Sequence, residues 1–597
     1  MHYPSTHKTT HRLHRFHGGL HLPDNKAQST GRPVRQALVP ELLILPLQQH
    51  IGAIAKPLVS AGDHVLKGQM IAAPQGLISA PVHAASSGVV VGIEDRPIPH
   101  PSGLSAPCIL IRTDGEDRWC ELPEPIGDVN AINPDTLRAR IRDAGIVGMG
   151  GAAFPTSVKV NPGREQPIDT LVINGAECEP YITCDDMLMR ERAGRVVAGV
   201  AVLRQLVEAE KCLIGIEDNK PDAIAAMTQA VKDIGLDQTT VVTIPTHYPS
   251  GGERQLIKVL TGLEVPSEGI PARIGIVCHN VGTAAAVADA VLEGKPLISR
   301  LLTLTGQGIA EPCNLEVLVG TPVSELIRQA GGYTNAASRL ILGGPMMGFT
   351  LPDDQVPVTK ASNCLLVAGV GEAPDPGPAA PCIRCGECAK VCPANLLPQQ
   401  MYWYARAKDL EKVQEYNLFD CIECGCCSHV CPSHIPLVQY YRYAKQESWA
   451  LDLEKHKSEH ARHRHEARQE RLARLEAEKK ARLKKKKAAL KKKPTAAGKS
   501  ADPKKAAIDA ALKRAAEKKA QLAEKASSRK TPSSSPKPSK GRWTQPTPAG
   551  RRPGRRSRRL MLPRSKPNDR TDDGCVSPTS HHPTPNGPTA SPGLCYG

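Results

Sequence analysis

Two cysteine runs between residues 381 and 433 carry the clearest chemistry in the sequence. Each has the spacing Cys-x2-Cys-x2-Cys-x3-Cys-Pro, and together they hold eight of the 19 cysteines. Four thiolates hold one iron–sulfur cubane, and the fourth cysteine of such a run, before Pro, ligates the cluster of the other run. We therefore predict two 4Fe–4S clusters. The first is assigned to Cys382, Cys385, Cys388 and Cys431, and the second to Cys392, Cys421, Cys424 and Cys427.

The sequence around the two runs indicates how the cysteines are held. Residues 397–410 have a helical composition, and a Pro- and Gly-rich linker at 374–380 precedes the first run. We predict an α-helical ferredoxin-type domain over residues 374–445 rather than a compact β-hairpin type. Zinc ribbons are the structural alternative, but they use two Cys-x2-Cys pairs rather than this longer run twice. Cys426 lies between predicted ligands and is expected to be a small buried hydrophobe.

The net charge of +17 is concentrated in the last quarter of the chain. Residues 452–597 hold 39 Lys and Arg against 14 Asp and Glu, a net of +25, which leaves a net of −8 for residues 1–451. A mildly acidic body argues against a fold built to neutralise nucleic-acid phosphates. The first 19 residues lack an apolar leader, and the ligand-like cysteine spacing favours metal binding in a reducing compartment over disulfides. No run of about 18 apolar residues is present, so we expect no membrane-spanning helix.

Residues 133–300 are expected to form an α/β domain. Helical segments there alternate with short apolar runs, at 170–174, 211–216, 240–244 and 273–278. Buried strands that alternate with helices indicate a parallel sheet. Ligands of such sheets bind in the loops at the carboxyl ends of the strands. The loops that follow these runs are therefore the candidate binding loops.

Four loops of this domain carry residues suited to an anionic cofactor. Residues 148–156 are Gly-rich and are followed by Lys159. Glycines let backbone N–H groups approach an anion closely, and a nearby Lys adds positive charge. A Gly-rich loop alone is more often a plain turn, so the prediction of a cofactor site depends on the other loops that accompany it. Three further loops, at 174–180, 247–254 and 278–283, each follow a predicted strand.

In this order the four loops resemble those of the FMN- and NADH-binding 51-kDa subunit of respiratory complex I, over about residues 135–350. The resemblance implies FMN as a cofactor and NAD(H) as a substrate. It implies that the flavin is held by Gly148, Gly150, Gly151, Lys159 and Asn174. It places Glu177 and Glu179 in the second loop, with Glu179 contacting the nicotinamide nucleotide. The matching residues of the third and fourth loops are Tyr248, Gly252, Glu253, His279, Asn280 and Thr283.

The sequence departs from that family at two places. The third loop is one residue longer, with Arg254 where the family has a second acid, and His279 stands where the family has Asn. Both departures lie in the third and fourth loops, not in the Gly-rich loop. Each of Glu177, Glu179 and Glu253 is equally compatible with a helix-capping or surface carboxylate.

Two smaller β domains are predicted on either side of the α/β domain. After an N-terminal segment, residues 1–33, the residues 34–120 resemble a biotinyl/lipoyl hammerhead. The turn at 73–78 has no Lys, so a carrier function is not expected. Residues 301–350 resemble the β-grasp of SLBB domains, with strands at 301–305 and 315–319 and a helix at 323–329. The fold class is thus multidomain α/β.

This domain order, together with both cysteine runs, resembles the C subunit of the Rnf/Rsx electron-transport complexes over about residues 10–450. The resemblance implies a peripheral subunit on the cytoplasmic side of the inner cell membrane. Its partners would be integral and peripheral membrane subunits and a ferredoxin-like subunit. Electron transfer between NAD(H) and these partners, through FMN and two 4Fe–4S clusters, would be coupled to ion translocation. A flavin links two-electron hydride chemistry to one-electron clusters, so no proton-transferring catalytic side chain is assigned.

Two other functions stay open on the sequence alone. One is a soluble flavin and iron–sulfur reductase similar to cobalamin reductases, and the other is a cluster relay without flavin. Residues 452–529 are expected to be a charged helical extension, and residues 530–597 a disordered basic tail rich in Pro and Ser. The extension is either a solvated segment or a contact with an anionic membrane surface. No recognisable fold supports specific binding of nucleic acid.

Overall fold

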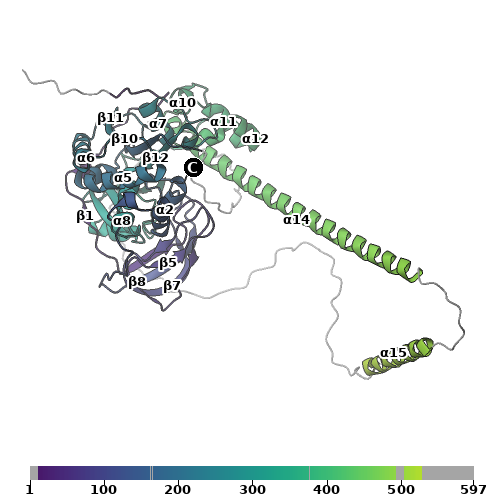
Figure 1. Ribbon diagram of the computed structural model, residues 1–597. Coiled ribbons are helices and arrows are strands. Elements are labelled where there is room, and N and C mark those ends of the chain that lie inside the picture. The colour runs from purple at the N-terminus through teal and green to yellow at the C-terminus, as the bar shows by residue number, and fades with distance from the viewer. Residues whose placement is uncertain (1–10, 162, 164–165, 375–376, 492–502, 528–597) are drawn as a thin grey trace, which may run out of the picture. The chain divides into compact units, whose positions relative to one another are not determined.

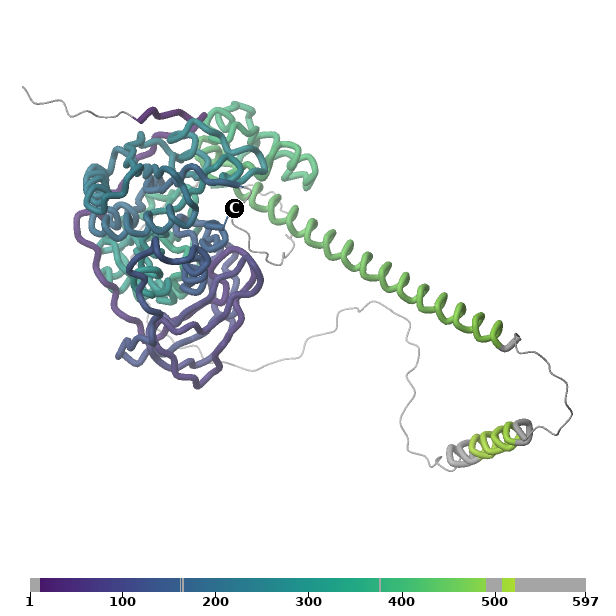
Figure 2. Tube along the Cα trace, viewed as in Figure 1, coloured from purple at the N-terminus to yellow at the C-terminus, as the bar shows by residue number. Residues whose placement is uncertain are grey.

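The computed structural model describes residues 11–161, 163, 166–374, 377–491 and 503–527 (Figures 1 and 2). The described residues divide into two units, one that ends at Ser458 and one that begins at Glu459. In the second unit the described residues are helical. They form the end of α14 (Leu437–Lys491) and α15 (Pro503–Ser527), within the region expected to be a charged helical extension. The predicted disordered tail at 530–597 lies outside the described residues.

A four-stranded parallel sheet forms the centre of the first unit. Its order is β11 (Thr239–Ile244), β10 (Lys211–Glu217), β9 (Thr170–Gly175) and β12 (Ile276–Asn280). The predicted α/β class with parallel strands is confirmed. The fourth strand begins three residues later than expected, because Pro271–Ile274 form a 3-10 helix that ends at Gly275 with φ +71°. A positive φ of this size ends a helical turn at low cost only for Gly.

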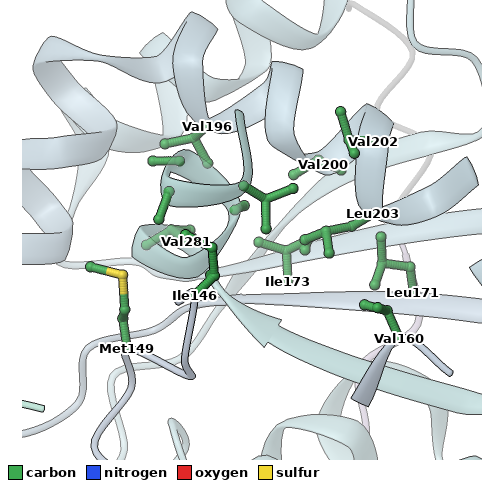
Figure 3. Packing of buried hydrophobic residues seen from close by; sticks show 14 of the residues in the cluster. Ile146, Met149, Val160, Leu171, Ile173, Val196, Val200, Val202, Leu203 and Val281 are labelled. Carbon is green, nitrogen blue, oxygen red and sulfur yellow. The ribbon is translucent and has the colours of Figure 1, made fainter. Parts of the chain in front are cut away.

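Helices cover both faces of this sheet. Successive residues of a strand point to opposite faces. Leu171 and Ile173 pack in a core with α5, α6 and α8, whereas Val172 packs in a second core with α7. Figure 3 shows part of the first core, where Leu203 of α5 lies beside Ile173 and Leu171 of β9. The helices of this domain are α2 (Pro134–Asp143), α3 (Thr156–Lys159), α4 (Cys184–Glu191), α5 (Ala193–Val207), α6 (Pro221–Ile234), α7 (Glu253–Thr261) and α8 (Val281–Leu292).

The predicted hammerhead is a pair of small antiparallel sheets around one core, which includes Leu43, Ile71 and Ile109. The larger sheet has the order β2, β8, β7, β4, and the smaller has the order β3, β5, β6. Their bounds are β2 (Leu42–Pro46), β3 (Lys56–Pro57), β4 (His64–Val65), β5 (Met70–Ala73), β6 (Val82–His83), β7 (Gly88–Pro97) and β8 (Ser105–Thr113).

The β-grasp unit is larger than the sequence suggests. Its six-stranded sheet has the order β1, β14, β13, β17, β15, β16, with α9 (Val323–Gln329) packed in its core. The apolar run of β17 pairs in parallel with β13, so the sheet extends past residue 350. The short β1, from the segment before the hammerhead, adds an edge strand beside β14. The strands are β1 (Arg35–Gln36), β13 (Ser299–Thr305), β14 (Cys313–Leu318), β15 (Ala337–Leu342), β16 (Phe349–Thr350) and β17 (Cys364–Gly369).

The cysteine-rich region is helical, as expected. It consists of α10 (Glu387–Lys390), α11 (Pro398–Ala407), α12 (Leu410–Glu415), α13 (Cys426–His429) and the first part of α14. Tyr441 of α14 is 1% exposed and donates from its hydroxyl to the carbonyl oxygen of Pro398 at 2.7 Å. Among the described residues, no helix is long and apolar enough to cross a membrane.

One buried lysine ties three of these domains together. Lys360, which precedes β17 of the β-grasp sheet, donates from Nζ to the carbonyl oxygens of Pro81 in the hammerhead (2.9 Å) and Gly145 in the α/β domain (2.7 Å). It is 1% exposed, and burial lowers its pKa to about 7. The folded chain therefore favours the neutral amine, which an unfolded chain with the ordinary lysine pKa does not.

We expect the stability of the protein to rise between pH 7 and pH 9 through Lys360. In this interval the unfolded state binds the proton that the folded state has released, so stability rises with pH by up to about 1.4 kcal/mol per pH unit. Thermal unfolding of the wild type and of Lys360→Met, followed anaerobically at both pH values, measures this contribution. The melting temperature of the wild type relative to that of the variant should rise with pH, and a constant difference would contradict the assignment.

Candidate cofactor sites

The eight predicted cluster cysteines line two separate cavities. One is lined by Cys382, Cys385, Cys388 and Cys431, and the other by Cys392, Cys421, Cys424 and Cys427. Each cavity thus brings together the four thiols that the sequence assigns to one cluster, including the fourth cysteine from the other run. A set of four thiols around one cavity fits a cubane, because thiolates are the ligands of such clusters.

The two runs fold with the same backbone turn. Arg384 and Gly386 have φ values of +58° and +83°, and the corresponding Glu423 and Gly425 have +56° and +80°. These left-handed residues curl each run so that its first three cysteines face one cavity. The repeated spacing in the sequence therefore corresponds to a repeated local structure.

Cys426 also lines the second cavity, so its role must be separated from that of the ligands. A hydrogen bond from its thiol lowers the pKa of Cys424, whereas the same contact and burial raise the pKa of Cys426. The thiol of Cys426 thus lies in hydrogen-bonding contact with Cys424. The assignment of Cys424 rather than Cys426 as a ligand depends on the spacing of the run, Cys-x2-Cys-x2-Cys.

The Gly-rich loop meets the third and fourth candidate loops. The N–H of Met149 donates to the hydroxyl of Thr283 at 2.9 Å, and Nζ of Lys159 donates to Oε1 of Glu253 at 2.6 Å. Burial lowers the pKa of Lys159, but the charge of Glu253 outweighs it and holds the pKa above its ordinary value. Lys159 therefore stays cationic at this edge of the sheet.

The second loop is bonded to its neighbours in the same way. Nδ2 of Asn174 donates to the carbonyl oxygen of Gly251 at 2.7 Å, and Nδ2 of Asn280 donates to Oδ2 of Asp185 at 2.5 Å. Oδ1 of Asn280 accepts from the N–H of Gly282, so this residue also caps α8. All four loops thus lie together at the carboxyl edge of the sheet.

Several features of this edge fit a bound flavin phosphate. Gly151 has φ +125°, is exposed, and has open space where a Cβ would lie, while Gly150 beside it is also exposed. The N–H of Gly148 is used within the loop, donating to the carbonyl oxygen of Phe154. Nε2 of His279 is buried without a partner among the described residues. An open Gly loop, a cation and an unpartnered buried nitrogen are a suitable set for an anionic ligand.

The acidic residues of the second loop already bind protein backbone. The carboxylate of Glu177 accepts from the N–H groups of Asp185 (2.7 Å) and Asp186 (3.1 Å) at the start of α4. Oε1 of Glu179 accepts from the N–H groups of Met346 (2.7 Å) and Met347 (2.9 Å), and burial raises the pKa of both glutamates. The structure therefore gives both carboxylates a positioning role.

The third loop is divided between two environments. Gly252 precedes α7 with Glu253 as its first residue, close to Lys159. Tyr248, however, is 3% exposed, and its hydroxyl donates to the carbonyl oxygen of Cys424 at 2.7 Å. Tyr248 thus contacts a residue that lines the second cysteine cavity.

Two contacts at this junction were not anticipated from the sequence. Arg254, noted only as a departure from the complex I pattern, donates to Oδ1 of Asp420 at 2.9 Å, directly before the second cysteine run. Lys26, from the N-terminal segment, donates to the carbonyl oxygens of Glu177, Glu179 and Ile182. Neither contact could be inferred from a local sequence motif, because each partner lies more than 150 residues away in the sequence.

Four family models match the chain in the order of these domains. They are the RnfC barrel sandwich hybrid domain over residues 14–116 and the Nuo51 FMN-binding domain over 141–289, followed by the SLBB domain over 301–350 and the 4Fe-4S dicluster domain over 381–435. The predicted fold classes and the cofactor classes, FMN and iron–sulfur clusters, agree with these matches.

Relatives match across most of the chain. The C subunit of the ion-translocating oxidoreductase complex of Pseudomonas aeruginosa is 53% identical over 469 residues, covering 79% of this chain and 60% of that protein. The protein of the same name from Serratia proteamaculans is 47% identical over 509 residues, covering 85% of this chain and 70% of that protein. The chain thus spans about three fifths of the length of the Pseudomonas relative. A crystal structure of an NAD+-reducing NiFe-hydrogenase in the H2-reduced state is 21% identical, with a TM-score of 0.39, and covers 51% of this chain and 61% of that one. On the identity and coverage of these relatives, the chain belongs to the RnfC family, the C subunits of ion-translocating oxidoreductase complexes.

Proposed function

We propose that this chain is the peripheral electron-transfer subunit of a membrane-bound complex. It exchanges electrons between NAD(H) and ferredoxin-like partners, and the complex couples this transfer to ion translocation. The observation that carries the proposal is one chain with both an FMN-binding type of domain and two cavities of four thiols. The printed name of the relatives, a subunit of an ion-translocating oxidoreductase complex, supports the coupling.

The residues of the four loops are proposed to hold the flavin and to orient the nucleotide. Bound FMN would exchange two electrons with the nicotinamide and single electrons with the clusters. Lys159, kept cationic by Glu253, and the open N–H groups around Gly151 suit the phosphate, while Asn174 supports the loop beneath it. His279 is neutral, because burial lowers its pKa well below the ordinary value, and its free Nε2 is available to a ligand.

The eight cysteines are proposed to ligate two 4Fe–4S clusters in a fixed order of transfer. The second cavity contacts the flavin domain through Tyr248 and Arg254, so its cluster is the first acceptor from the flavin. Cys385 of the first cavity is exposed, so that cluster is the one that meets an external partner. Electrons moving toward the nicotinamide would follow the reverse order.

Partners and location follow from the same argument. We propose integral and peripheral membrane subunits and a ferredoxin-like subunit as partners, on the cytoplasmic side of the membrane. The described side chains of α14 beyond Glu459 are almost all exposed, and residues 484–487 are four consecutive lysines. Such a segment suits contact with an anionic lipid surface, at about 1 kcal/mol for each basic residue near the lipid.

The test of the proposal is anaerobic. The chain is purified, its iron, sulfide and FMN are quantified, and NADH is added while the flavin absorbance is followed. We expect about eight irons, as two cubanes require, and one FMN that bleaches with NADH. Full iron content without flavin, or without bleaching by NADH, would contradict the proposal and would indicate that the chain only relays electrons through its clusters.

We expect substitutions of a predicted ligand and of a neighbouring cysteine in the second cavity to change the iron content differently. Cys421→Ala should lower the iron content from about eight toward about four per chain, because one of the four ligands of the second cluster is lost. Cys426→Ala is the matched control, since Cys426 lines the same cavity, and this variant should keep both clusters. Iron analysis and low-temperature EPR of the reduced proteins measure the result. Equal loss in both variants would contradict the ligand assignment.

Glu179 is expected to act on stability rather than on nucleotide binding. Glu179→Ala leaves the N–H groups of Met346 and Met347 without their acceptor, at a cost of about 1–3 kcal/mol. Glu179→Gln keeps an acceptor oxygen and should restore most of this stability. Anaerobic thermal unfolding and the KM for NADH separate the two roles. If Glu179→Ala raises the KM for NADH and leaves the stability unchanged, Glu179 contributes to nucleotide binding instead.

A further inference from the structure

The N-terminal segment 16–22 crosses the junction between the flavin domain and the second cysteine cavity. Leu20 forms an antiparallel bridge with Tyr248, with two backbone hydrogen bonds of 2.8 and 2.9 Å. The rings of Phe16 and His21 both stack on His247, at centroid distances of 5.0 and 4.7 Å. The segment therefore follows the third loop of the flavin domain closely.

The same segment also bonds to the loop that carries Cys392. The N–H of Gly19 donates to the carbonyl oxygen of Val391 at 3.0 Å, and Nδ1 of His17 lies 3.0 Å from the carbonyl oxygen of Cys392. A carbonyl only accepts, so Nδ1 is the protonated nitrogen of His17. Gly18 has φ +66°, and a Cβ there would lie 2.5 Å from the carbonyl carbon of Val391.

The segment is anchored to the flavin domain on both sides of this crossing. On one side the N–H of His14 donates to the carbonyl oxygen of Val259 in α7 at 2.9 Å. On the other side Lys26 is 6% exposed and donates to the carbonyl oxygens of Glu177 (2.9 Å) and Glu179 in the second loop, and to that of Ile182 just after it. A segment that is held at both ends on the flavin domain can hold the loop of Cys392 against that domain.

We propose that residues 16–22 are a positioning strap that sets the distance between the flavin site and the second cluster. The proposal rests on the proposed function, because it assumes that electrons cross this junction. The strap holds the Cys392 side of the cavity, and Tyr248, to which it is bridged, holds the Cys424 side. Electron exchange across the junction therefore depends on backbone contacts of an N-terminal segment that carries no cofactor ligand.

Gly18→Ala tests the proposal. Its Cβ would displace the loop of Val391 and Cys392, because φ +66° and the 2.5 Å approach leave no space for it. We expect unchanged iron and FMN contents and unchanged bleaching of the flavin by NADH. Reduction of the clusters after the flavin, followed by stopped-flow absorbance, should slow by about tenfold or more. Hydrogen exchange of the amides at 391–396 should increase.

Two further variants keep the test decisive. Gly31→Ala is the control, since a Cβ there meets nothing within 4 Å and its φ is −76°, and it should behave as the wild type. His17→Leu removes only the bond to Cys392 and should raise exchange of the same amides if Gly18→Ala does not fold. Unchanged cluster reduction and exchange in a folded strap variant would overturn the proposal. Absence of flavin bleaching in the wild type would instead overturn the proposed function.

Discussion

The hydroxyl of Tyr248 joins the two chemical halves of this protein. It belongs to a loop at the carboxyl edge of the parallel sheet, and it donates to the carbonyl oxygen of Cys424 at 2.7 Å. Nearly every other contact at this junction supports that arrangement. Arg254 pairs with Asp420, Glu179 accepts from the N–H of Met346, and a Cβ on Gly425 would lie only 2.6 Å from the carbonyl oxygen of Met346. These contacts hold the α/β domain against the cysteine-rich domain, and the proposed electron transfer between them depends on that separation.

The parts of the structure that were predictable from the sequence are those with local causes. Cysteine spacing determines which thiols can face one cavity, since three of each set lie within a single turn repeated at Arg384 and Glu423. Short apolar runs such as β9 and β10 are buried on both faces, which is typical of strands in a parallel sheet. These patterns were sufficient for the α/β class, the helical cysteine domain and the grouping of thiols. They do not depend on which distant segments happen to meet.

The parts that were not predictable depend on contacts between distant segments. Glu179 and Tyr248 lie in loops that resemble a nucleotide site, and the structure adds contacts that the sequence does not indicate: the carboxylate binds the turn at 346–347, and the phenol contacts a cysteine run. These contacts were not predictable, because their partners lie 167 and 176 residues away in the sequence. The same holds for Lys26 and for β17, whose pairing with β13 enlarges the β-grasp sheet beyond its expected end.

The two cysteine cavities share a ligand set and a backbone turn but differ in surroundings. Cys424 and Cys427 are buried, and the carbonyl oxygens of Cys392 and Cys424 accept hydrogen bonds from His17 and Tyr248. In the other cavity Cys385 is exposed. Cluster potentials depend on solvent exposure and on hydrogen bonding around the ligands, so identical ligand sets in unlike surroundings are expected to differ in potential. The asymmetry that a relay needs can thus come from the fold around two copies of one motif, without any change to the motif itself.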